Sequence, residues 1–254
     1  MAAESVPERS VMRSVERALD VIDTLGESGR PLRLADVARA TGLHIATAQR
    51  ILRVLEHREY VSLNSGVYSN GPAVLAAAHS YQVGNQLVLA AMPVLQELAT
   101  VLGATASLSV RIGKSRVLVA RVEGSSPLRY QLPIGGRLPL HLGAGKVFLA
   151  YMSSEERTKA LEGISEIVTA AGEHIPMAEF GSILKKVAKQ GYAVSSNERV
   201  MGATSVSAPV RVADGSVVAA LQVSGSHEDL QGERLDAMPR ELVNAAASIA
   251  QRCR

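Results

Sequence analysis

The sequence predicts an α+β protein with an N-terminal winged helix-turn-helix, a linker helix and a C-terminal domain whose largely antiparallel sheet is flanked by helices. Three observations support this prediction. The first 60 residues place apolar residues at helical spacing, with a glycine-containing turn between two short helices. A hairpin turn signal, "NSG", follows those helices. Later in the chain, strand-like runs are grouped before and after a helical middle, which is typical of one antiparallel sheet.

The composition narrows the class of protein before any motif is considered. The 254 residues form one large domain or two modest ones, and a hydrophobic fraction of 47% is ample for a packed core. Aromatic residues make up only 3%, so we do not expect nucleic-acid bases to stack on side chains. The single cysteine, Cys253, can form neither an internal disulfide nor a thiolate metal cluster, which suits a reducing compartment.

Two stretches bear on localisation. The opening "MAAESVPERS" lacks the apolar core of a secretory signal. The most apolar stretch, residues 73–102, is interrupted by polar residues and by Pro93, so it does not predict a membrane span. These features predict a cytoplasmic protein with no membrane partner.

The first predicted elements are a tail and two helices. Residues 1–10 are expected to form a flexible tail and residues 11–71 the winged helix-turn-helix. Residues 14–28 predict an amphipathic helix with the apolar stripe Val15, Leu19, Ile22 and Leu25. Residues 33–41 predict a shorter helix that ends at Gly42, with the stripe Leu34, Val37 and Ala38.

The third predicted helix separates an apolar face from a polar one. Its apolar stripe is Ala48, Ile51, Leu52 and Leu55. Residues 44–58 carry three arginines against one acid, and from charge alone a solvated face is the simpler interpretation. In a helix-turn-helix, however, the stripe packs on the first two helices and the polar face enters the major groove of DNA. The residues expected to face DNA are Thr47, Gln49, Arg50 and Arg53.

A hairpin over residues 60–71 completes the predicted winged domain. Its turn contains no lysine or arginine, so we expect Asn64, Ser65 and main-chain N–H groups to contact the DNA backbone rather than to read bases. One recognition helix reads too little sequence for useful specificity. The sequence therefore predicts at least a homodimer on a roughly palindromic operator.

Residues 72–85 predict a linker helix, and residues 86–254 a second domain. Its first helix is expected to run to about residue 102. The strand-like runs after it are "ATASLSVR", "SRVLVARVE" and "LRYQLP". The helical middle consists of "GAGKVFLAYM", "SSEERTKALEG" with a capping-box spacing at Ser153 and Glu156, and "EFGSILKKVAKQ". The remaining strands are "GYAVSSN", "TSVSAPVRV" and "SVVAALQVSG", before a final helix "LDAMPRELVNAAASIAQRC".

Several of these segments together resemble the IclR family of transcriptional regulators, over nearly the whole chain. "DVARATGL…TAQRILRVLEHREYV" is similar to the winged helix of that family. "LPLH…GAGKVFLA" and "GYAVSSNERVMGATSVSAPV…GSVVAALQVSG" are similar to its two effector-domain signatures. The resemblance implies a DNA-binding regulator that senses a small organic molecule. It also implies a GAF-like effector domain and a homodimer or homotetramer, acting as repressor or activator.

The sequence departs from the family pattern at several positions. The recognition helix opens with Ile45, Ala46 and Thr47 where the family often has Lys-Ser-Thr, so two polar contacts are missing. The segment between His141 and Lys146 is one residue shorter than the common pattern. Relatives that bind small oxo-acids carry an aspartate where this chain has Ser195.

The resemblance also implies an effector pocket. The N–H groups of Gly143 and Ala144 would receive a ligand carboxylate, with a plain tight turn as the alternative. Neutral polar groups would come from Ser195, Ser205, Gln222 and Ser224, and apolar contacts from Leu132, Leu140 and Leu142. Glu198 and Gly202 match the acid-x-x-x-Gly spacing of the family, and Glu198 is interpreted as an acid that supports the turn, with direct ligand contact as the alternative. We therefore expect a small carboxylate with an aromatic or apolar body.

Other chemistries find little support in the sequence. "GAGK" lacks the earlier glycine and the Ser or Thr of a phosphate-binding loop. The six histidines show no metal-ligand spacing, and no G-x-S-x-G motif is present. We expect no catalytic residues, cofactor or metal. The alternative function is an enzyme whose GAF-like domain is fused to a helix-turn-helix, and turnover of the ligand distinguishes the two.

Overall fold

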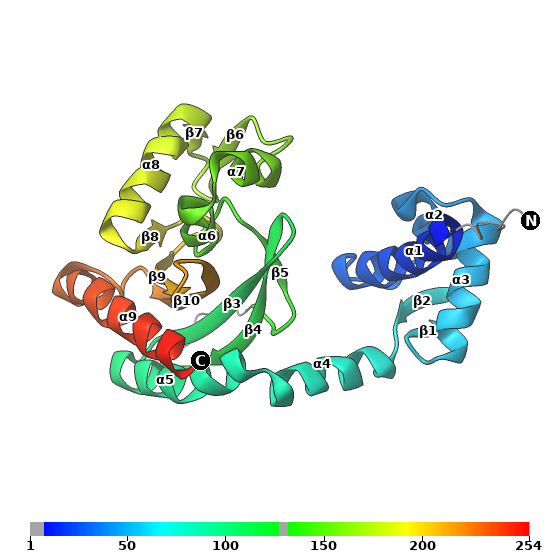
Figure 1. Ribbon diagram of the computed structural model, residues 1–254, viewed down its shortest axis with the longest axis horizontal. Coiled ribbons are helices and arrows are strands. Elements are labelled where there is room, and N and C mark those ends of the chain that lie inside the picture. Colours follow the sequence, from blue (N-terminus) through cyan, green and yellow to red (C-terminus); the bar gives the residue numbers. More distant parts are fainter. Residues whose placement is uncertain (1–7, 127–131, 254) are drawn as a thin grey trace, which may run out of the picture. The chain divides into compact units, whose positions relative to one another are not determined.

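The computed structural model describes residues 8–126 and 132–253 (Figure 1). The chain divides into two compact units, residues 1–81 and 82–254, and each has a hydrophobic core of its own. Among the described residues, no single helix is long and apolar enough to cross a membrane. Only α4 (Pro72–Gly84) and α5 (Gln86–Leu102) taken together reach that length, and they are bent by 75° at the break between them.

The N-terminal unit is the predicted winged helix-turn-helix. Its elements are α1 (Glu8–Glu27), α2 (Leu34–Thr41), α3 (Ile45–His57), β1 (Val61–Asn64) and β2 (Val67–Asn70). Gly42 closes α2 in the left-handed conformation, with φ of 67°, and so makes the tight turn into α3. Helix α1 begins at Glu8, inside the predicted tail, while residues 1–7 lie outside the described part of the chain.

The apolar stripe predicted for α1 is partly wrong. Val21 and Leu25 are buried, with Ala18 and Ile22 packed beside them. Val15 and Leu19 are instead exposed over 57% and 56% of their surfaces. The residues of α1 that pack on the core are Ala18, Val21, Ile22 and Leu25, which share one helical face. Leu19 lies about 100° round the helix from Ala18, and Val15 lies one turn before the first of these residues, so neither is buried against this core.

Helix α3 and the wing follow the prediction closely. Ala48, Leu52 and Leu55 are buried in the core of this unit. Strands β1 and β2 pair in antiparallel register, with Asn64 opposite Val67. Ser65 and Gly66 between them have φ of 50° and 79°, the two positive values that a type I′ hairpin turn requires.

The C-terminal unit is built on one antiparallel sheet. Its strand order is β5-β4-β3-β10-β9-β8, and every neighbouring pair is antiparallel. The strands are β3 (Thr105–Ile112), β4 (Ser115–Val122), β5 (Arg137–Pro139), β8 (Ala193–Ser196), β9 (Ala203–Arg211) and β10 (Val217–Ser226). The other elements are α6 (Gly145–Tyr151), α7 (Ser154–Ala160), β6 (Glu166–Val168), β7 (His174–Pro176), α8 (Met177–Gln190) and α9 (Gly232–Arg252).

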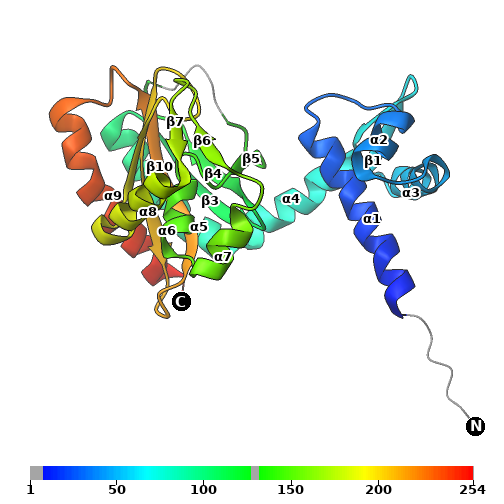
Figure 2. The ribbon, with the colours of Figure 1, turned by 90° about the horizontal axis from the view of Figure 1, so that it is seen from above.

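Helices cover both faces of this sheet, and the two faces differ. Helices α5 and α9 pack on one face and form the larger core with inward residues such as Leu108, Val206 and Leu221. Helices α6 and α8 cover only part of the other face, through a second core around Phe148, Phe180 and Ala220. Figures 1 and 2 show the two helix layers on opposite sides of the strands. The uncovered part of the second face is therefore available for a binding site.

Two details of this unit bear on the predictions. The capping box at the start of α7 is confirmed: the Ser153 side chain accepts from the Glu156 N–H, and Glu156 accepts from the Ser153 N–H. The strand predicted at "LRYQLP" covers residues 128–133, of which 128–131 lie outside the described chain, and the edge strand β5 follows at Arg137. The β6–β7 hairpin was not predicted, because strands of three residues carry too short a pattern.

Candidate functional site

Polar side chains line up across four strands on the partly uncovered face of the sheet. Ser195 of β8 lies opposite Ser205 of β9, which lies opposite Ser224 of β10, which lies opposite Thr105 of β3. Cross-strand partners share one face and lie a few ångströms apart. Four hydroxyl groups therefore form a row perpendicular to the strands. Serine and threonine hydroxyls both donate and accept hydrogen bonds, so the row suits a ligand that carries oxygen atoms.

The neighbouring row adds an amide and a cation. Gln222 of β10 lies opposite Ser107 of β3, and Ser107 lies opposite Arg121 of β4. Arg121 donates to the backbone oxygen of Leu132 at 2.7 Å and also pairs with Glu123. Leu132 is thus held beside Arg121 at the same face.

An irregularity in β4 brings a second arginine onto this face. Leu108 pairs with Ala120 and Ser109 with Leu118, so Val119 has no partner opposite it. Such a bulge changes which residues point to which face. As a result Arg116, Leu118 and Arg121 all border the pocket, although strict alternation would place Arg116 and Arg121 on opposite faces.

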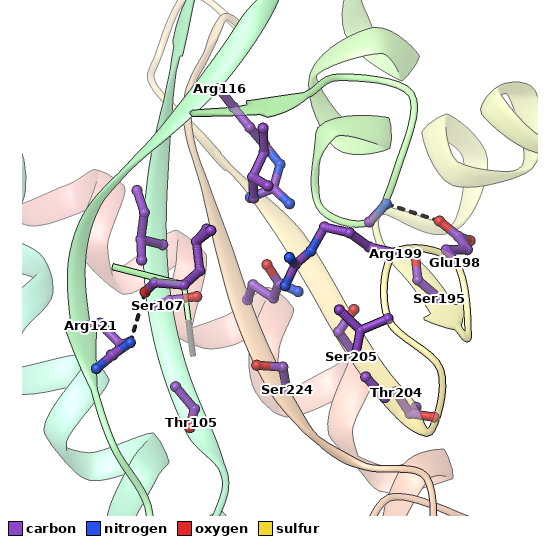
Figure 3. A pocket seen from close by; sticks show the side chains of 17 residues that line it. Thr105, Ser107, Arg116, Arg121, Ser195, Glu198, Arg199, Thr204, Ser205 and Ser224 are labelled. Carbon is purple, nitrogen blue, oxygen red and sulfur yellow. Dashed lines mark hydrogen bonds between the residues drawn. The ribbon is translucent and has the colours of Figure 1, made fainter. Parts of the chain in front are cut away.

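These residues enclose a cavity. The centre of a water molecule can occupy about 80 Å³ of this cavity, which is more space than a single water needs. Figure 3 shows Arg116 and Arg199 extending into it, with Ser195, Ser205 and Ser224 along the strands. The cavity is lined by Thr105, Ser107, Arg116, Leu118, Arg121, Leu132, Leu138, Gly143, Ser195, Glu198, Arg199, Val200, Ala203, Thr204, Ser205, Gln222 and Ser224.

Arg116 is the most buried charged group of the pocket. Only 2% of its surface is exposed, and its Nη1 atom lies 3.4 Å from the Ser109 hydroxyl. Burial, together with the charge of Arg199, lowers the pKa of Arg116 to about 10. The guanidinium therefore stays protonated at neutral pH.

Glu198 occupies the loop that was expected to receive a ligand carboxylate. The Gly143 N–H donates to Glu198 Oε2 at 2.9 Å, and Lys146 Nζ donates to Glu198 Oε1. Lys146 also donates to the Val194 carbonyl at 3.2 Å. Ala144 is fully buried and does not line the cavity. The Gly143 N–H, one of the two donors of the expected cradle, is thus bonded to a carboxylate of the chain itself.

The glycines of "GAGK" are explained by the fold rather than by a phosphate. Gly143 has φ of 60°, a left-handed conformation that favours glycine. A Cβ atom at Gly145 would lie 2.2 Å from the Leu140 carbonyl oxygen, which no side chain tolerates. Close packing of the loop on the start of α6 therefore requires both residues.

His141, in the same loop, is partly buried. Burial lowers its pKa below the usual value, while the negative charge of Glu198 acts in the opposite direction and raises it. The imidazole is therefore held mainly in its neutral form near physiological pH.

The structure gathers five of the six predicted effector-site residues around one cavity: Gly143, Ser195, Ser205, Gln222 and Ser224. Of the predicted apolar contacts, Leu132 lines the cavity, whereas Leu140 and Leu142 pack in or beside the core under α6 and α8. The cationic residues Arg116, Arg121 and Arg199 were missed. Strand alternation could not have placed both Arg116 and Arg121 on the pocket face, because the bulge at Val119 shifts the alternation of β4 by one residue.

The predicted DNA-facing residues lie outside the core of the N-terminal unit. Arg50 and Arg53 are exposed on α3, and Thr47 and Gln49 are partly exposed. Asn64 and Ser65 are exposed at the wing turn. Val54 is also exposed, over 59% of its surface, so the outer face of α3 carries an apolar residue beside its arginines. Apolar contacts of this kind suit the methyl group of thymine in the major groove.

Comparisons with known proteins agree with this architecture. Residues 14–65 match the family described as the IclR helix-turn-helix domain, and residues 79–251 match the one described as bacterial transcriptional regulator IclR C-terminal. The HTH-type transcriptional regulator XynR of Escherichia coli strain K12 is 28% identical over 95% of this chain and 97% of its own.

Solved structures show the same fold. A putative transcriptional regulator from Rhodococcus sp. RHA1 is 30% identical, with a TM-score of 0.75 over 95% of this chain and 98% of that one. An IclR homologue from Microbacterium hydrocarbonoxydans, solved in complex with 4-hydroxybenzoate, has a TM-score of 0.75 at 21% identity, over 94% and 98% of the two chains. From its winged helix to its effector domain, this chain belongs to the IclR family of transcriptional regulators.

Proposed function

We propose that this regulator binds operator DNA through α3 and the wing, and that a small organic carboxylate in the described pocket modulates its operator affinity. The observation that carries the proposal is the convergence of Arg116, Arg121 and Arg199 with a row of hydroxyl groups around one cavity. Cations and neutral hydrogen-bonding groups in one concave site are suited to an organic anion.

The lining also indicates the body of the effector. Leu118, Leu132 and Leu138 border the cavity and offer apolar contact. Ser195 places a neutral hydroxyl where relatives that bind oxo-acids carry an aspartate, so the pocket does not repel an anion at that point. A structural neighbour was solved with 4-hydroxybenzoate, which supports an aromatic carboxylate as the class to test first.

The proposed mechanism is a shift of population. Two winged helices of a homodimer or homotetramer would contact the half-sites of a roughly palindromic operator. An effector that binds one arrangement of the assembly more tightly favours that arrangement and changes the fit to DNA. Light scattering of the free protein and of its DNA complex tests the assembly, and a monomer in both states would contradict it.

The pocket favours sensing over catalysis. The Ser195 hydroxyl is buried and has no hydrogen-bond partner among the described residues, so no base within that part of the chain activates it. A sensor returns its ligand unchanged. Incubation with 4-hydroxybenzoate followed by chromatography should therefore recover all of the acid, and steady loss of the acid would favour the enzyme alternative.

The central experiment measures DNA binding with and without effector candidates. The full chain first selects duplexes from a random pool, and its affinity for the selected operator is then measured in the presence of aromatic and aliphatic carboxylates. We expect at least one acid to change operator affinity while its amide does not. Failure to enrich any duplex would contradict the regulator mechanism, and equal effects of acids and amides would contradict a carboxylate effector.

A further inference from the structure

Arg116 lines the pocket and is almost wholly shielded from bulk water. It projects from β4 on the same face as the hydroxyl row, and its own exposed fraction is 2%. Its Nη2 atom lies 3.3 Å from the point where a Cβ of Gly143 would be, so the guanidinium also abuts the loop before α6. The group is therefore fixed between strand and loop.

The guanidinium has too few partners within the described part of the chain. Its Nε atom is buried and makes no hydrogen bond there, and its contact with Ser109 is long, at 3.4 Å. No salt bridge joins Arg116 to a described acidic residue. Arg199 adds a second positive charge nearby. Buried charges in proteins are normally paired, because an unpaired one is costly.

Glu198, which also lines the pocket, does not pair with Arg116. Glu198 places one carboxylate oxygen on the Gly143 N–H and the other on Lys146 Nζ. Lys146, whose side chain is 5% exposed, thus has its own counter-charge, whereas Arg116 has none among the described residues. The positive charge of Arg116 therefore has no partner among the described residues and is available to an anion that binds in the pocket.

We infer that Arg116 is the anion anchor of the effector pocket and that the effector's carboxylate pairs with its guanidinium, while the Gly143 N–H of the loop before α6 remains bonded to Glu198. Arg199 faces the same space and adds positive potential. Guanidinium and carboxylate groups match in geometry and form paired, charge-assisted hydrogen bonds. The ligand body would then lie along Leu118 and Leu138 with its far end toward the hydroxyl row. This inference rests on the proposed function and specifies how its ligand is recognised.

The test uses the full chain and a matched set of probes. 4-Hydroxybenzoate carries the charge, and 4-hydroxybenzamide has the same ring and hydroxyl without it. Binding of both is measured by titration calorimetry and by thermal shift for the wild type, Arg116→Met, Arg116→Lys and the control Arg111→Met. Arg111 is the cross-strand partner of Arg116 in β3 but is exposed, so its loss removes a nearby charge without touching the pocket.

We expect the wild type and Arg111→Met to bind the acid and to prefer it to the amide. Arg116→Met should bind the acid about 30-fold more weakly or worse and lose the preference, since a buried charge pair is removed. Arg116→Lys should keep part of the preference, because it keeps the charge without the planar fork. A Met variant that binds the acid as tightly as the wild type would overturn the inference while leaving the proposed function intact.

The ligand-free proteins provide a second measurement. A buried charge that is paired only when ligand is bound does not stabilise the ligand-free protein. The Tm of Arg116→Met should therefore equal or exceed that of the wild type. A large fall in Tm for both the Met and Lys variants would show that the guanidinium serves the fold, which overturns the inference.

Two further outcomes separate the inference from the proposal on which it rests. If neither probe binds the wild type at millimolar concentration, both the anion anchor and the carboxylate effector fail together. If the acid binds through Arg116 but leaves operator affinity unchanged, the anchor stands and the proposed regulation fails.

Discussion

Glu198 accepts a hydrogen bond of 2.9 Å from the backbone N–H of Gly143, 55 residues earlier in the chain, and its other oxygen accepts from Lys146. This contact joins the loop after β8 to the loop before α6, and both residues line the pocket. It also explains why a glycine-rich turn that resembles an anion cradle is already satisfied without a ligand. The stability of the pocket wall should therefore depend on this ion pair.

Replacing Glu198 by Gln should lower the free energy of unfolding by roughly 3 kcal/mol, because Lys146 is then left buried without a counter-charge. The double variant Glu198→Gln with Lys146→Met should recover much of that loss, since no buried charge remains unpaired. Urea denaturation of Glu198→Gln, Lys146→Met and the double variant gives the free energy of interaction between the two side chains. Strictly additive losses would show that the pair contributes little.

Ser195→Ala should leave the ligand-free protein as stable as the wild type or up to about 1 kcal/mol more stable, because it removes a buried hydroxyl that lacks a partner. The same change should weaken binding of 4-hydroxybenzoate by about 3- to 10-fold if that hydroxyl serves the ligand. Ser182→Ala, at an exposed position on α8, is the control. A clear loss of stability with unchanged ligand binding would contradict the assignment.

His141 should make the protein less stable as the pH falls. Because burial lowers the pKa of His141 in the fold, the unfolded chain binds more protons than the folded chain once the pH drops below about 6.5. The stability that the protein gains by burying a neutral His141 is fully present above that pH. It is lost as the pH falls from there through the pKa of His141 in the folded protein. Denaturation at pH 7.5 and at pH 5.5 should show a smaller difference for His141→Gln than for the wild type. His79→Gln, exposed on α4, should behave like the wild type.

Arg50→Ala should weaken operator binding. A loss of ~1–3 kcal/mol confined to certain sequences would mean that Arg50 reads a base, whereas a salt slope reduced by about one would mean that it contacts a phosphate. Arg39→Ala is the control, since Arg39 is exposed on α2 and pairs with Asp36. Binding that stays unchanged over a full salt titration would remove Arg50 from the interface.

The wing should contribute affinity but not base preference. In the double variant Asn64→Ala with Ser65→Gly, the turn keeps its positive φ values and loses only two polar side chains. We expect an equal loss of affinity for every duplex, because contacts to the backbone carry no sequence information. Selection from a random pool should return the wild-type consensus. A changed consensus would show that the wing reads bases.

The sequence by itself determined the winged helix-turn-helix and the type of the second domain. The stripe Ala48, Leu52 and Leu55 repeats at the helical period, and "NSG" supplies the residues that a type I′ turn needs. These are local signals, because helix period and turn geometry depend on residues close together in the chain. They failed at Val15 and Leu19, because the other helices of the unit decide which face of α1 is buried and over what length.

The chemistry of the pocket was decided only by the tertiary structure. The row from Ser195 to Thr105 depends on the register of four strands, and Arg116 joins Arg121 on one face only because Val119 bulges. The sequence pattern gave the expected cradle at Gly143 but not its occupant, since Glu198 reaches it from a separate loop. Register, bulges and contacts between distant segments arise from packing of the whole sheet, so no window of sequence contains them.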